Sequence, residues 1–109
     1  MAAVPPVPEI PEDLDYALTL IGMTIPAQRV RIVEREGLTK IDDLGLFQSK
    51  EIETMATRYM KLPQLQCIDF GLLRLKRLKA VAHWAHKQKR SNIPVDYHAL
   101  TAEVLVEMI

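Results

Sequence analysis

Residues 69–90 contain no proline and only one glycine, Gly71, near the start of the stretch. Proline breaks helices and glycine weakens them, so this stretch favours one continuous helix. Asn92 and Pro94 supply a stop signal after it. We predict a helix over 69–90, about 30 Å long at about 1.5 Å per residue. In a chain of 109 residues, the other elements must pack on such a helix.

The predicted helix has an apolar side and a polar side. At about 100° per residue, its core-facing side comprises Leu72, Leu75, Leu78, Val81, Ala82 and Ala85. The polar side comprises Lys76, Arg77, His83, Lys87 and Gln88. Three apolar residues, Leu73, Ala80 and Trp84, also point to the polar side.

The charge of the chain is unevenly distributed, although 14 basic and 14 acidic residues give a net charge of zero. Residues 1–69 hold 7 basic and 11 acidic side chains, a net charge of −4. Residues 70–90 hold 7 basic side chains and no acid, and residues 91–109 hold 3 acids and no base. The overall zero therefore does not exclude a polyanionic partner for the long helix, because counterion release favours phosphate binding by clustered cations.

Trp84 has two interpretations. In the first, the helix is central and packs on both sides, and long basic side chains cover the indole ring. In the second, Trp84 is an exposed aromatic anchor among cations that stacks a base or meets a protein partner. The candidate residues for contact with nucleic acid or a partner are Arg74, Lys76, Arg77, Trp84, Lys87, Lys89 and Arg90.

A turn motif occurs twice ahead of this helix, as Gly22-Met23-Thr24 and, 15 residues later, as Gly37-Leu38-Thr39. We expect each glycine to take the left-handed conformation that ends a helix. The next apolar residue should fold back on that helix, and the threonine should cap the following one. Thr39 and Asp42 have the spacing of a capping box.

These turns divide the region before the long helix into short helices, over about 13–21, 25–36, 40–44 and 50–61. Gly45 should end the third of them, and Ser49 should cap the fourth. Residues 1–11, with four of the seven prolines, are predicted to form a flexible arm. Residues 12–109 should form a single domain, in which a bundle over 12–61 packs on the helix 69–90. Asp96 or Thr101 should cap a terminal helix within 96–109.

The sequence gives no sign of an active site or a metal centre. His83 and His86 are the only ligand pair on one helix, and the single cysteine, Cys67, follows no metal-ligand spacing. No Cys-His pair can be assigned as nucleophile and base, and no glycine-rich phosphate loop precedes a helix. We therefore expect no catalytic residue, no cofactor, no metal ion and no small-molecule substrate.

A single cysteine also favours a reducing compartment, because it cannot form an internal disulfide. With no signal peptide and no apolar stretch of transmembrane length, we predict a cytoplasmic or nuclear protein without membrane contact.

The tandem turns and the stretch GLTKIDDLGLFQSKEIETM (37–55) resemble the compact bundles called SAM-like or helix-hairpin-helix-like. The resemblance implies an all-α fold, with a bundle of short helices packed on one long basic helix, and five to six helices in total. DNA-binding hairpins have two glycines in each turn, whereas here Thr24 or Thr39 takes the second place. The resemblance thus implies the bundle, but not phosphate binding by its turns.

Residues 12–109 also resemble the N-terminal, Gag-like region of copia-type retrotransposons of diatoms and related algae. The likeness rests on the tandem turns, on RLKRLKAVAHWAHKQKR (74–90) and on IPVDYHALTAEVL (93–105). It implies a structural protein that assembles around the RNA of the element. The chain lacks the C-x-x-C zinc knuckle and the protease motif of a full Gag polyprotein, so it would correspond to the leading segment only.

We expect a non-enzymatic binding or assembly module that contacts nucleic-acid phosphates, in RNA or DNA, through the basic helix. The alternative is a SAM-type protein-interaction module that self-associates through surfaces of opposite charge.

Overall fold

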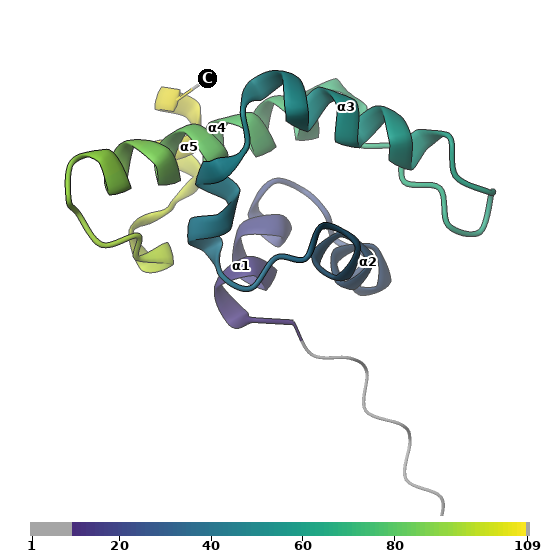
Figure 1. Ribbon diagram of the computed structural model, residues 1–109, viewed down its shortest axis with the longest axis horizontal. Helices are drawn as coiled ribbons and strands as arrows, with labels where there is room; N and C mark the ends of the chain where they lie inside the picture. Colours follow the sequence, from purple (N-terminus) through teal and green to yellow (C-terminus); the bar gives the residue numbers. More distant parts are fainter. Residues whose placement is uncertain (1–9, 109) are drawn as a thin grey trace, which may run out of the picture.

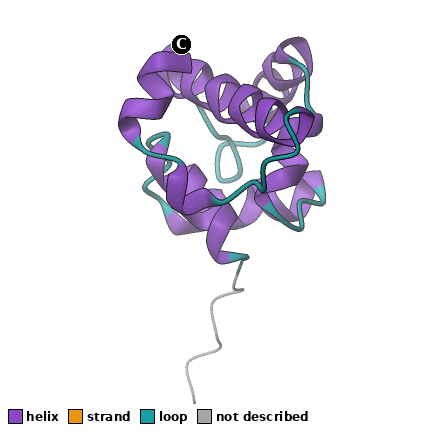
Figure 2. Cartoon of the chain, turned by 90° about the vertical axis from the view of Figure 1, so that its left-hand side faces the viewer, coloured by secondary structure: helices purple, strands orange, loops and turns teal. Residues whose placement is uncertain are grey.

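The computed structural model describes residues 10–108, which form helices joined by loops and turns, with no strand among them (Figure 1, Figure 2). The prediction of an all-α bundle with one long helix is therefore confirmed. Of the arm predicted for 1–11, residues 1–9 lie outside the described part; Ile10 packs against the core and Pro11 precedes the first helix. The elements are α1 (Glu12–Leu20), α2 (Pro26–Glu36), the 3-10 helix η1 (Ile41–Leu46), α3 (Ser49–Met60), α4 (Gly71–Arg90), the 3-10 helix η2 (Tyr97–Ala99) and α5 (Ala102–Met108).

The long helix α4 is the central element of the fold. It packs against η1, α3 and α5, while α1 packs against α2, η1 and η2 (Figure 1). One hydrophobic core joins all these elements. Its fully buried members from different parts of the chain include Leu14, Leu18, Ile32, Ile41, Ile52, Ile68, Leu78, Val81 and Leu100.

Both glycine turns form as predicted. Gly22 and Gly37 have positive φ angles of 108° and 68°. In each turn the next residue donates a backbone hydrogen bond across the end of the helix, from Met23 N to Leu18 O and from Leu38 N to Val33 O, both of 3.0 Å. The side chains of Met23 and Leu38 are buried, so each turn directs an apolar residue back into the core.

The predicted helix caps are wrong in detail. Thr24 does not cap α2, whose cap position is Ile25. Thr39 bonds to Asp43 rather than Asp42: Asp43 Oδ2 accepts from Thr39 N at 2.7 Å and from Thr39 Oγ1 at 2.8 Å, because η1 begins one residue later than predicted. The bond from the Thr39 backbone is the main cause that lowers the pKa of Asp43.

The cap of α3 differs for a similar reason. Ser49 is the first residue of α3 and Gln48 takes the cap position. Glu51 Oε1 accepts from Gln48 N at 2.9 Å, so the acidic side chain of the first turn draws the start of the helix back by one residue.

The prediction that Gly45 ends the short helix is wrong. Gly45 lies inside η1 and is buried. A Cβ atom placed there would lie 2.9 Å from His86 N and 3.1 Å from Ala85 C, both in the backbone of α4. The glycine therefore serves a close approach of two backbones rather than the end of a helix.

The terminal segment is not one helix. Asp96 Oδ1 accepts from His98 N at 3.0 Å and caps η2, and Thr101 Oγ1 accepts from Val104 N at 3.3 Å at the start of α5. Both predicted caps are therefore used, by two separate elements. Leu100 lies between them in an extended conformation, is fully buried, and accepts a bond of 2.6 Å from Tyr16 Oη through its carbonyl.

Helix α4 begins two residues later than predicted. Asp69 Oδ1 accepts from Gly71 N at 3.0 Å, and Gly71 has a φ of 68°. Leu72, assigned to the core side, is 69% exposed. It lies six positions before Leu78, about 120° away around the helix, so it falls at an edge of the predicted core side that no other described element covers.

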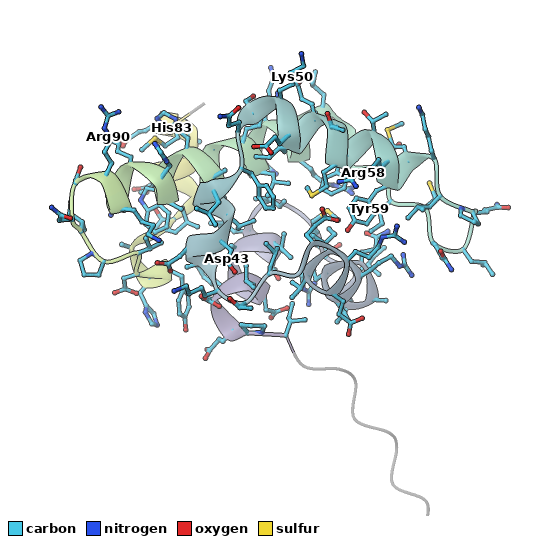
Figure 3. The ribbon with its side chains drawn as sticks, viewed as in Figure 1. Asp43, Lys50, Arg58, Tyr59, His83 and Arg90 are labelled. Atoms are coloured by element: carbon cyan, nitrogen blue, oxygen red, sulfur yellow. The ribbon has the colours of Figure 1, made fainter. Side chains whose placement is uncertain are left out.

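Tyr59 links α3 to the end of α2. Its hydroxyl donates to Glu36 Oε2 at 2.7 Å, while Arg58 Nη2 lies 3.5 Å from Glu36 Oε1 (Figure 3). The Arg35 guanidinium lies over the Tyr59 ring, 5.9 Å from its centroid. Burial raises the pKa of Tyr59, and the bond to the Glu36 carboxylate raises it further.

Replacement of Gly45 should destabilise the fold in proportion to side-chain size. We expect Gly45→Ala to lower the free energy of unfolding by about 1–3 kcal/mol, because the backbone of α4 cannot move away cheaply. Gly45→Leu should cost more. At Gly37, where nothing lies within 4 Å, leucine should cost no more than alanine, because only backbone strain matters there. Urea denaturation measures all four variants, and a stabilising Gly45→Ala would contradict the close approach.

The Tyr59–Glu36 bond should appear in the alkaline stability of the protein. A raised pKa means that the unfolded chain ionises first, so the contribution of Tyr59 is complete below about pH 10 and declines as the pH rises further. Tyr59→Phe should lower the free energy of unfolding at pH 7 by about 1–3 kcal/mol, because Glu36 loses a donor. It should also reduce the decline above pH 10, and an unchanged decline in urea titrations would refute this role.

Candidate functional site

The exposed cations of α4 lie mainly on one side of the helix. Lys76, Lys87 and Arg90 are exposed together with His83, at successive spacings of seven, four and three residues that place them above one another. Figure 3 shows His83 and Arg90 pointing outward from the same side of α4. None of these four residues forms an ion pair with any residue in the range 10–108. We call this set the α4 cationic stripe.

Lys89 is also exposed but lies elsewhere on the helix. It follows Lys87 by two positions, about 200° around the axis, and so projects from a different side. The predicted contact set is therefore not a single surface.

Three of the predicted contact residues on α4 contact other parts of the protein instead of facing solvent freely. Arg77 Nη1 lies 3.5 Å from Ile21 O, the carbonyl that follows α1, and its charge suits the negative end of that helix. Arg74 Nη1 lies 3.3 Å from Asp69 O. Trp84 packs into the core.

Trp84 is only 4% exposed, which contradicts its assignment as an exposed anchor. Ala80, one turn earlier, is buried as well. The interpretation that α4 is central and packs on both sides is thus the correct one. Trp84 has polar neighbours in the helical projection, but it faces the core because other elements cover α4 on two sides. No base can stack on this ring.

Lys79 is held by a neighbouring helix. Its Nζ forms an ion pair with Glu53 Oε1 of α3. That interaction lowers the pKa of Glu53 and ties α3 to the side of α4 that carries the stripe. The pair is solvent-accessible, so it positions side chains more than it stabilises the fold.

A groove runs between α4 and the connection from η1 to α3. Its volume is about 820 Å³. The α4 wall supplies Lys76, Lys79, His83 and His86, and the opposite wall supplies residues 45–49 and Ile52, with Met108 of α5 also in the lining. Among these, Phe47 is half-buried and Leu46 is 70% exposed. The groove thus combines an apolar lining with cations and imidazoles on one wall.

The sequence alone did not indicate this groove. Its walls come from segments at least 24 residues apart, and their meeting depends on the close approach at Gly45. The only signal was indirect: a glycine and a phenylalanine, Gly45 and Phe47, in a segment that otherwise read as a helix end.

Acidic groups gather on a different part of the surface. Tyr97 of η2 lies near Glu12, Asp13 and Asp96, whose charges add to the burial that raises the pKa of its phenol. In Figure 1, η2 and the start of α1 lie below α4, whereas the side chains of His83 and Arg90 point upward in the same view in Figure 3. The acidic group around Tyr97 therefore lies away from the side chains of His83 and Arg90.

Within residues 10–108, no three His, Cys, Asp or Glu side chains are placed to share a metal ion. Cys67 Sγ donates to Met60 O at 3.3 Å and has no histidine as a partner. None of the helices in the same range combines the length and apolar character needed to cross a bilayer. What the surface offers chemically is a line of exposed cations beside a groove with an apolar lining.

The chain matches no protein-family model, no curated protein and no solved structure.

Proposed function

We propose that this chain is a non-enzymatic module that binds nucleic-acid phosphates through the α4 cationic stripe. The observation that carries the proposal is that Lys76, Lys87 and Arg90 are exposed along one side of α4, on a helix without a carboxylate. Unpaired side chains of this kind keep their full charge for a ligand, and each phosphate they neutralise releases counterions.

The dimensions of the stripe suit a nucleic-acid backbone. From residue 76 to residue 90 the helix rises about 21 Å, at about 1.5 Å per residue. Since one strand of B-form DNA places a phosphate about every 3.4 Å, this length faces about six phosphates. The resemblance to a Gag-like region adds RNA as the natural polyanion, and this assignment stays a prediction.

A second candidate function is self-association, favoured by the acidic group around Tyr97 on a side of the molecule away from the stripe. Contact between unlike surfaces of identical copies does not close on itself and would give open chains. The stripe would then bind a carboxylate surface of the next copy instead of phosphates.

Phosphate binding predicts a steep dependence on salt. A labelled single-stranded oligonucleotide of about 12 nucleotides should bind at low salt, and log K should fall linearly with log salt concentration. Lys87→Gln/Arg90→Gln should make this slope shallower by about 1.4, at about 0.7 per phosphate contact on a single strand. Fluorescence anisotropy between 50 and 200 mM salt measures the slope.

The matched control is Lys40→Gln/Lys61→Gln, which removes the same charge from exposed positions outside α4. It should leave the slope unchanged. Equal effects of the two double variants would mean that only net charge matters, and absence of binding at low salt would remove the proposal.

Self-association predicts that the solution mass rises with protein concentration. Multi-angle light scattering should then show monomers for both Lys87→Glu/Arg90→Glu and Glu12→Gln, because each alters one of the two surfaces. A wild-type protein that stays monomeric at millimolar concentration would exclude this second function.

A further inference from the structure

We propose that the groove between α4 and the η1–α3 connection receives an unpaired base of a single-stranded nucleic acid whose phosphates lie along the α4 cationic stripe. This inference rests on the proposed function and specifies its substrate class as single strands.

The first support is the position of the groove relative to the stripe. Lys76 and His83 belong to both: they line the groove and also stand in line with Lys87 and Arg90, which lie outside it. A strand whose phosphates follow the stripe therefore passes the mouth of the groove, and a base on that side can turn into it.

The second support is the chemistry of the lining. Phe47, His83 and His86 bring three planar rings to the walls of the groove. Rings of these residue types are the ones on which unstacked bases are held in single-strand complexes. Both imidazoles are exposed and neither forms an ion pair with any residue in the range 10–108, so they are accessible to a ligand.

The third support is the apolar surface left open beside these rings. Leu46 stands at the groove with 70% of its surface exposed, and Met108 contributes a thioether side chain to the lining. A base has an apolar face to cover this surface and a charged backbone to meet Lys76. An inorganic anion has only the charge, and a neutral apolar compound has only the face.

The geometry also argues for single strands over duplexes. In a duplex the bases are stacked and paired inside the helix, so only phosphates and groove edges reach a protein surface. The stripe alone would bind both forms, whereas the groove gives an advantage only to a strand with free bases.

The experiment compares three labelled ligands of about 12 nucleotides: oligothymidine, the same backbone with abasic sites in place of the thymines, and the oligothymidine–oligodeoxyadenosine duplex. Wild-type protein should bind oligothymidine about tenfold more tightly than the abasic strand, because stacking adds to phosphate contact. Equal affinity for these two strands would overturn the inference while leaving phosphate binding intact.

Two variants separate the groove from the stripe. Leu46→Ser/His86→Ala alters two exposed lining residues outside the stripe and should bring the affinity for oligothymidine close to that for the abasic strand. Lys87→Gln/Arg90→Gln should weaken binding to both strands and leave their ratio near tenfold. Circular dichroism and thermal melting confirm that both variants are folded.

The remaining outcomes are equally informative. If the ratio survives in Leu46→Ser/His86→Ala, the base binds elsewhere and the assignment to this groove is wrong. If the duplex binds as tightly as oligothymidine, selection of single strands is wrong. If none of the three ligands binds at low salt, the proposed function itself fails.

Discussion

The close approach of η1 to α4 at Gly45 is the contact on which the rest of the structure depends. The Cα of this glycine faces the α4 backbone at Ala85 and His86, so closely that a single added carbon would meet backbone atoms 2.9–3.1 Å away. Such proximity needs a residue without a side chain on η1, and on α4 a surface formed by backbone atoms and a small side chain, here that of Ala85. It fixes where the connection to α3 runs, and hence where the groove opens.

Helix α4 is covered on two sides. With η1 and α3 against one part of its surface and α5 against another, residues that a helical projection assigns to opposite sides, such as Trp84 and Ala85, are both buried. The residues of the α4 cationic stripe remain exposed. The charges of Lys76, Lys87 and Arg90 are accessible because no packing partner within the described chain covers them.

Local sequence signals were sufficient for much of this fold. Helix-ending glycines act within one turn, so the turns at Gly22 and Gly37 and the bounds of the helices around them could be predicted closely. The caps were less predictable, since whether Asp42 or Asp43 bonds to Thr39 depends on a one-residue difference in where η1 begins. The environment of Trp84 and the role of Gly45 could not be predicted, because each depends on an element distant in sequence.

Tyr16 and Leu100 connect the two ends of the described chain, 84 residues apart in sequence. Leu100 is fully buried, and the ring of Tyr16 lies 5.3 Å from that of Tyr97. During synthesis on the ribosome, the first helix therefore emerges long before the residues that complete its environment. Its apolar side stays incompletely covered until a segment 84 residues downstream has left the exit tunnel, so native packing of the first helix waits for that segment.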